Sequence, residues 1–132
     1  MGARVLIVED ELIVAEDLQN KLQQLGHEVV GSAATGEDAV KQAASLTPNL
    51  ILMDVRLQGS MTGIEAAQHI QAMADIPIVY VTAYSAAFLR QPEQSVSPGL
   101  WVRKPFSMGD LKAIVDVALR SKESPVNLSD LA

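Results

Sequence analysis

The hydrophobic residues of this chain gather in five short runs, separated by longer segments with a helical spacing. The runs cover residues 4–8, 28–33, 50–53, 76–81 and 100–102. The third run, Leu50–Met53, is an unbroken apolar stretch, which is typical of a strand that is buried on both faces of a sheet. Strands of this kind belong to parallel sheets covered by helices, so the pattern predicts an α/β fold.

Between these runs, apolar residues recur at intervals of three and four, as in helices that pack one face on a core. Gly26 ends the first predicted helix, Gly36 opens the second and Gly63 precedes the third. The predicted inward-facing residues are Ala15, Leu18, Leu22 and Leu25; then Ala39, Val40, Ala43 and Leu46; then Ile64, Ala67, Ile70 and Met73 or Ala74; and in the last helix Leu111, Ile114, Val115, Ala118 and Leu119.

The end of the chain is less regular. Pro92 interrupts an otherwise helical segment at residues 85–97. Because a proline inside a helix costs about 3 kcal/mol, that helix is predicted to be short or kinked. The last helix is predicted to begin near Ser107, an N-cap with Asp110 at the third helical position.

Strands that alternate with helices are joined by right-handed crossovers, which place helices on both faces of the sheet. The sequence therefore predicts a doubly wound, five-stranded parallel sheet. At 132 residues the chain is long enough for one domain with a proper core. We expect that domain over residues 1–122, followed by a tail or linker at 123–132 where the periodic pattern stops.

Composition narrows the possible functions. A formal net charge of −6 and the absence of a basic stripe argue against direct nucleic-acid binding. The lack of cysteine excludes disulfides and thiolate metal sites and agrees with a cytoplasmic location. No apolar run approaches the length of a membrane span, and Met1–Ala3 lead directly into the first predicted strand without a signal peptide.

Polar residues follow the predicted strands at the points where the strands end. Glu9 and Asp10 follow the first strand, Asp54 the third, Thr82 the fourth and Lys104 the fifth. Taken alone, Asp54 is explained equally well by a structural role, as a turn former or a helix cap, and by a place in a ligand-binding site. Together, however, these residues would meet at the carboxyl edge of one sheet, where α/β proteins bind ligands.

This group of residues has the chemistry of a phosphoryl site. Three carboxylates close together repel one another, so they raise a pKa or require a cation. Oxygen ligands without histidine or cysteine suit Mg²⁺. Lys104 and the Thr82 hydroxyl offer a charge and a hydrogen-bond donor to a phosphoryl group, while the Asp54 carboxylate is a possible nucleophile. The small side chain of Ala83 leaves room for a phosphoryl donor.

The sequence resembles the receiver domain of two-component response regulators, a domain that is also found in hybrid histidine kinases. The resemblance covers about residues 4–121, and the order and spacing of its motifs are highly specific. These motifs are Val5–Glu11, Leu52–Asp54, Gly63–Glu65 after a loop that contains Gly59, Val81–Ala83 and Val102–Phe106.

The resemblance implies a flavodoxin-like sheet with the strand order 2-1-3-4-5. It also implies that Asp54 accepts a phosphoryl group from a histidine kinase or a histidine phosphotransfer protein. Glu9, Asp10, Asp54 and the backbone carbonyl of Arg56 would hold Mg²⁺. Lys104 would pair with the phosphoryl group, and Thr82 would rotate to bond it. Such a domain is not a classical enzyme, although it catalyses its own phosphotransfer and its own dephosphorylation.

The same resemblance implies that the Lys104–Pro105 bond is cis, and that Arg56 and Tyr84 tune the rate of hydrolysis. Trp101 stands where the family usually has a tyrosine or phenylalanine that moves on activation, so it is either a switch residue or a packing residue. A downstream effector domain or protein would receive the signal, and a homodimer is a further partner that the resemblance allows. His27 and His69 are expected to be solvated.

Three other classes of protein share features with this sequence. A flavodoxin needs a phosphate-binding loop after the first strand, where Glu9–Glu11 would repel a phosphate. A phosphoaspartyl phosphohydrolase has a second aspartate two residues after the first, where this chain has Arg56. The remaining alternative is a receiver-like binding module that acts without phosphorylation. Such modules usually lose an acid or the lysine, and this chain keeps them all.

Overall fold

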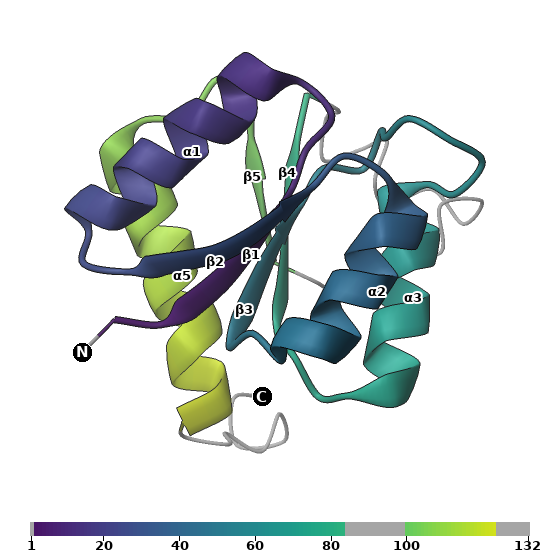
Figure 1. Ribbon diagram of the computed structural model, residues 1–132. Helices are drawn as coiled ribbons and strands as arrows, with labels where there is room; N and C mark the ends of the chain where they lie inside the picture. Colours follow the sequence, from purple (N-terminus) through teal and green to yellow (C-terminus); the bar gives the residue numbers. More distant parts are fainter. Residues whose placement is uncertain (1, 84–99, 124–132) are drawn as a thin grey trace, which may run out of the picture.

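The computed structural model describes residues 2–83 and 100–123 and contains a five-stranded sheet between two layers of helices (Figure 1). The strand order is β2-β1-β3-β4-β5, and each neighbouring pair is parallel. The predicted doubly wound, flavodoxin-like sheet is therefore confirmed. The strands are β1 (Arg4–Val8), β2 (Glu28–Ala33), β3 (Leu50–Met53), β4 (Ile78–Thr82) and β5 (Leu100–Arg103).

Helices cover both faces of the sheet. Helices α1 (Leu12–Gln24) and α5 (Met108–Glu123) lie on one face, and α2 (Gly36–Leu46) and α3 (Gly63–Met73) lie on the other (Figure 1). The segment predicted as an interrupted helix at residues 85–97, including Pro92, lies outside the described residues. Helix α5 ends one residue beyond the boundary predicted at residue 122, and the domain boundary itself stays a prediction.

The central strands contribute side chains to two hydrophobic cores, because successive side chains of a strand point to opposite faces. Leu6 and Val8 of β1 contribute to the core under α2 and α3, which we call the α2–α3 core. Val5 and Ile7 contribute to the core under α1 and α5, the α1–α5 core. All four residues of Leu50–Met53 are at most 1% exposed, as expected for the middle strand of a covered sheet.

Side chains cap the helices where the sequence changes from turn to helix. Thr62 and Glu65 form a reciprocal capping box at the start of α3. At α5, the Asp110 amide donates to Ser107 Oγ and the Ser107 amide donates to Asp110 Oδ2, which confirms the predicted cap. The first helix ends before Gly26, whose φ of 91° is a conformation that glycine adopts without strain.

Three details differ from the prediction. β4 begins at Ile78 rather than at residue 76, although the Pro77 carbonyl still accepts a hydrogen bond from the Ile51 amide. Met73 and Ala74, at the end of α3, are both exposed, and Ala66 is buried although it was not predicted to face inward. His69 is exposed as expected.

His27 is not simply solvated. It is half-buried, and its Nδ1 accepts a hydrogen bond of 3.0 Å from the Ala3 amide. Burial lowers its pKa, an effect that the charge of Asp116 opposes. The imidazole therefore joins the entry of β1 to the turn before β2. Within the described parts of the chain, none of the helices has both the length and the apolar character needed to cross a membrane.

Candidate functional site

The ladder of the sheet places the polar residues at its carboxyl edge. The Glu9 amide donates to the Ala33 carbonyl and the Asp54 amide donates to the Val8 carbonyl, both at 2.9 Å. The Lys104 amide donates to the Thr82 carbonyl at 2.8 Å. Each site residue therefore continues the parallel pairing by one step beyond its strand, and its position is fixed by the backbone.

Glu9, Asp10 and Asp54 each offer a carboxylate oxygen, and these oxygens lie within 4.8 Å of one another. Glu9 and Asp54 are buried and Asp10 is half-buried. Burial strengthens the repulsion between carboxylates because less water screens it. The donor set consists of hard oxygens only and opens to solvent on one side, which fits Mg²⁺ with its retained waters.

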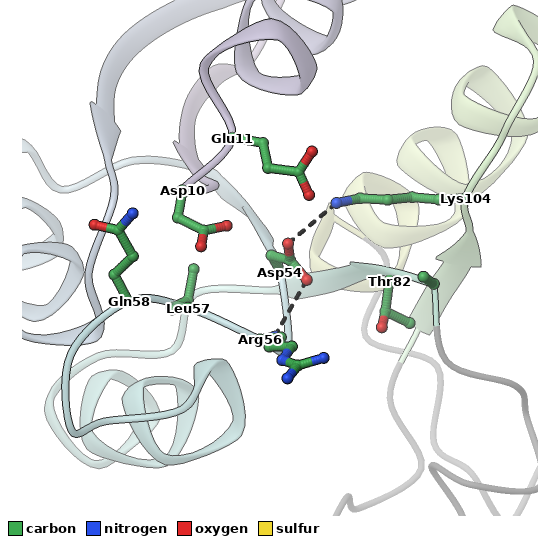
Figure 2. A pocket seen from close by; sticks show the side chains of 9 residues that line it. Asp10, Glu11, Asp54, Arg56, Leu57, Gln58, Thr82 and Lys104 are labelled. Atoms are coloured by element: carbon green, nitrogen blue, oxygen red, sulfur yellow. Dashed lines mark hydrogen bonds and ion pairs between the residues drawn. The ribbon is translucent and has the colours of Figure 1, made fainter.

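Lys104 points toward Asp54 from the side opposite Asp10 (Figure 2). Its Nζ is 2.5 Å from Glu9 Oε1 and 3.1 Å from Asp54 Oδ2. Burial raises the pKa of Glu9 to about 7, although the hydrogen bond from Lys104 acts against the rise. Burial would lower the pKa of Lys104, but its bonds to Glu9 and Asp54 outweigh that effect and raise it. The ammonium therefore stays charged and compensates part of the negative charge.

The backbone around Asp54 is closely packed. The Arg56 amide donates to Asp54 Oδ1 at 3.2 Å, and the Gly63 amide donates to the Val55 carbonyl at 2.8 Å. A Cβ on Gly63 would lie 1.8 Å from the carbonyl oxygen of Asp54. Only glycine can therefore occupy the first position of α3, which explains why Gly63 follows the aspartate at this spacing.

A pocket of about 450 Å³ opens above Asp54 (Figure 2). It contains five of the predicted site residues, Asp10, Asp54, Arg56, Thr82 and Lys104, together with Ala83. Three residues that line the pocket were not predicted as site residues: Glu11, Leu57 and Gln58. All three follow the ends of predicted strands, which is the signal that could have found them. The complete lining is Asp10, Glu11, Asp54, Arg56, Leu57, Gln58, Thr82, Ala83 and Lys104.

Trp101 is near the site but does not line this pocket. It is paired with Tyr80 in the sheet, and Thr82 is paired with Arg103. Because residues two apart on a strand share a face, Trp101 and Thr82 belong to the same face of the sheet. Trp101 is half-buried against the α2–α3 core. Tyr84, the other residue predicted to tune the site, lies outside the described residues.

The Lys104–Pro105 peptide bond is cis, as the family resemblance implied. Directly after it, Phe106 packs against the α1–α5 core. Its ring centroid lies 5.6 Å from Lys21 Nζ of α1, within the range of a cation–π contact. The segment that delivers Lys104 to the site is thus held by α1.

Comparison with known proteins shows the family to which the chain belongs. The sequence model of the response regulator receiver domain matches residues 5–116. The chain belongs to the receiver domain family of response regulators, which are signalling domains of two-component systems rather than classical enzymes.

Individual relatives show the same relationship. The chain is 35% identical over 127 residues to the phyllosphere-induced regulator PhyR of Methylorubrum extorquens, covering 94% of this chain and 46% of PhyR. It is 37% identical over 116 residues to the transcriptional regulatory protein PdtaR of Mycobacterium tuberculosis, covering 88% of this chain and 56% of PdtaR. The chain therefore spans about half the length of these curated relatives.

Solved structures of response regulators have the same fold as this chain. The response regulator PhyR of Brucella abortus superimposes with a TM-score of 0.85 at 32% identity, over 95% of this chain and 51% of that one. The receiver domain of PhyR from Erythrobacter litoralis gives a TM-score of 0.84 at 32% identity, with 96% of both chains covered.

Proposed function

We propose that this chain is a phosphoacceptor domain in which Asp54 takes a phosphoryl group from a histidine kinase or a histidine phosphotransfer protein. The observation that carries the proposal is the position of the Asp54 carboxylate. It belongs to a cluster of three carboxylates, pairs with the Lys104 ammonium and lines an open pocket. In the transfer, a carboxylate oxygen of Asp54 attacks phosphorus while the phosphorus–nitrogen bond to the donor histidine breaks. Water later hydrolyses the resulting acyl phosphate and restores the carboxylate.

The residues present fit a bound Mg²⁺. The carboxylates of Glu9, Asp10 and Asp54 and the backbone carbonyl of Arg56 would hold the ion. When bound, Mg²⁺ would neutralise charge on the carboxylates and on the phosphoryl oxygens. Lys104 would then be released from part of its pairing with Glu9 and would contact a phosphoryl oxygen, and the Thr82 hydroxyl would donate to another.

A second surface suits the phosphoryl donor. A groove of about 580 Å³ runs beside α1 and is lined mostly by apolar side chains, including Ile13 and Phe106. It shares Ala83 and Lys104 with the pocket above Asp54, so a protein seated on it would bring a side chain to the carboxylate. Leu12 and Ile13 are 73% and 82% exposed, which is unusual for large apolar residues and favours a docked partner.

Phosphorylation would change how the chain contacts a downstream effector domain or protein in the cytoplasm. Two relatives are named as regulators, and one solved relative is described as an anti-anti-sigma factor. For this chain the effector, like a possible homodimer, is part of the proposal. The groups that would respond to phosphorylation are Thr82 and Trp101, which share a face of the sheet.

The proposal is tested by incubating the protein with Mg²⁺ and a small acyl-phosphate donor and weighing it intact. We expect one phosphoryl adduct on the wild type, none on Asp54→Asn and an unchanged adduct on Asp75→Asn, which removes an exposed carboxylate away from the pocket. A full adduct on Asp54→Asn would overturn the assignment.

The alternative is a receiver-like module that binds partners without phosphorylation. The observation in its favour is that Lys104 pairs with both Glu9 and Asp54, so that the protein's own side chains compensate part of the acidic cluster. The same experiment separates the two functions. An absence of adduct on wild-type protein that nevertheless binds Mg²⁺ would favour the binding module.

A further inference from the structure

We infer that three consecutive residues before and at the start of α2, Thr35, Gly36 and Glu37, position the loop that would supply the Arg56 carbonyl to Mg²⁺. This loop joins β3 to α3 and covers residues 54–62. We call residues 35–37 the clasp. Nothing in the phosphoryl chemistry itself requires these residues, and none of them lines the pocket above Asp54.

Each clasp residue contacts a different part of the loop. Thr35 forms an isolated parallel bridge with Gln58. Gly36 is buried against Met61, so that a Cβ at residue 36 would lie 2.9 Å from both Cβ and Cγ of Met61. Glu37 accepts a hydrogen bond of 3.1 Å from Ser60 Oγ. The clasp therefore follows the loop residue by residue.

Glu37 also lies close to Gly59 of the loop. Gly59 has a φ of 93°, and a Cβ built there would lie 3.2 Å from Glu37 Oε2. Because residues that carry a side chain rarely adopt such a φ, the backbone conformation favours glycine at this position. The turn at Gly59 therefore lies against Glu37 of the clasp.

Among the described residues, the other side-chain hydrogen bonds of the loop lie at its two ends. The Arg56 amide donates to Asp54 at the start, and the Thr62 amide donates to Glu65 at the end. Between these ends, residues 56 and 58–60 are exposed, so they bury little surface of their own. The course of the middle of the loop therefore depends on the clasp and on the packing of Leu57 and Met61 against the α2–α3 core.

A loop that is displaced by a few tenths of an ångström at Met61 would turn the Arg56 carbonyl away from the carboxylate cluster. Supporting groups of this kind typically change metal affinity by about 10- to 100-fold when they are altered. We expect the clasp to act on the affinity for Mg²⁺ and to have little effect on phosphoryl transfer once the ion is bound. The inference rests on the proposed function, and it adds the start of α2 to the residues that set the Mg²⁺ requirement.

The test is a Mg²⁺ titration of the purified protein by calorimetry, repeated on Gly36→Ala. We expect the dissociation constant for Mg²⁺ to rise about tenfold. At saturating Mg²⁺, the rate of adduct formation with a small acyl phosphate should return to the wild-type value. Adding Met61→Ala to Gly36→Ala removes two of the three crowded side-chain atoms and should restore part of the affinity.

The matched control is Gly31→Ala. It also adds a methyl group between β2 and α2, where it would meet Gln42 Oε1 at 2.5 Å and Leu46 Cδ1 at 2.7 Å, but it does not touch the loop. It should lower thermal stability and leave the Mg²⁺ dissociation constant unchanged. A merely structural role of Gly36 would make the two variants behave alike.

Two milder variants keep the test decisive if Gly36→Ala does not fold. Ser60→Ala removes the donor to Glu37 and should weaken Mg²⁺ binding two- to threefold, about the effect of one exposed hydrogen bond. Glu37→Gln keeps an acceptor oxygen and should stay near the wild type. Without metal, hydrogen exchange at the amides of residues 56–62 should be faster in Ser60→Ala than in the wild type.

The two levels of the proposal fail differently. If the wild type does not bind Mg²⁺, the proposed function falls and the role of the clasp falls with it. If the wild type binds Mg²⁺ and takes the phosphoryl group, but Gly36→Ala and Ser60→Ala bind the ion as tightly as the wild type, the clasp alone is overturned.

Discussion

Nζ of Lys104 lies 2.5 Å from Oε1 of Glu9, a contact that joins residues 95 positions apart and buries an ion pair beside Asp54. The lysine thus stands at the edge of the group of oxygens that would hold a metal ion. It supplies one positive charge against three neighbouring carboxylates. A divalent cation and the lysine would therefore share the work of compensating the cluster.

Replacing Lys104 with methionine should destabilise the metal-free protein by about 3 kcal/mol, because the side chains of Glu9 and Asp54 are 1% and 8% exposed and would lose their partner. Urea unfolding at pH 8 measures the change. Mg²⁺ should recover part of it, since the ion compensates the same oxygens. Lys112→Met, which breaks an exposed pair with Asp116, should cost no more than about 0.5 kcal/mol. An equal loss with and without Mg²⁺ would contradict the shared role.

The raised pKa of Glu9 gives stability a distinctive pH dependence. The usual value is 4.5 and the folded value is about 7, so the folded state binds an extra proton between these values. Without metal, the contribution of Glu9 is full below pH 4.5 and is lost as the pH rises to about 7. The difference in unfolding free energy between wild type and Glu9→Gln should therefore change over this window. A pH-independent difference would count against the raised pKa.

The same protonation should affect metal binding. Mg²⁺ needs the ionised carboxylate, so its affinity for the wild type should increase from pH 6 to pH 8 and binding should release protons. Calorimetry in two buffers of different ionisation enthalpy measures the released protons. In Glu9→Gln this release should be smaller, and the affinity should be lower at every pH because one ligand is lost.

Gly63→Ala should be strongly destabilising, because its Cβ would lie 1.8 Å from the Asp54 carbonyl oxygen and backbone cannot move aside cheaply. We expect a loss of about 3 kcal/mol in unfolding free energy. Gly109→Ala is the matched control, also at the start of a helix but with its nearest neighbour, Ser107 Oγ, at 3.7 Å. It should be neutral or stabilising by up to about 1 kcal/mol. Similar losses in both variants would refute the close approach.

Trp101 should report activation, because it shares a sheet face with Thr82 and is the chain's one tryptophan. At saturating Mg²⁺, a phosphoryl mimic should change its emission in the wild type, less so in Thr82→Ala and not in Asp54→Asn. Unchanged emission and unchanged access to a quencher would make Trp101 a packing residue. The half-buried position beside Tyr80 is compatible with movement in either direction.

Much of this architecture is readable from the sequence because burial on both faces leaves a simple signature. Leu50–Met53 is apolar throughout and forms the middle strand, and residues at the carboxyl ends of β1, β3, β4 and β5 line the pocket. The pairing of Lys104 with Glu9 could not be read in this way, because it depends on the distance between two strand ends. The exposure of Met73 was likewise not predictable, since helical spacing identifies the buried stripe but not the point along the helix at which the core ends.

The clasp was equally invisible in the sequence. Thr35 and Gly36 look like an ordinary helix start, and the Thr35 hydroxyl does accept from the Asp38 amide as an N-cap. Their contacts with Gln58 and Met61 arise only when β2 and β3 lie on either side of β1. Local pattern therefore predicts the cap and misses the second role of the same residues.

The two separate cores have a consequence for how this domain can be controlled. The loop after Asp54 rests on the α2–α3 core through Leu57 and Met61, whereas the segment after Lys104 rests on the α1–α5 core through Phe106. A protein bound over one layer of helices would thus act on the metal ligands, and one bound over the other would act on the lysine. If Asp54 is phosphorylated as we propose, regulators bound over opposite layers of helices would alter the lifetime of the acyl phosphate without touching the reacting atoms.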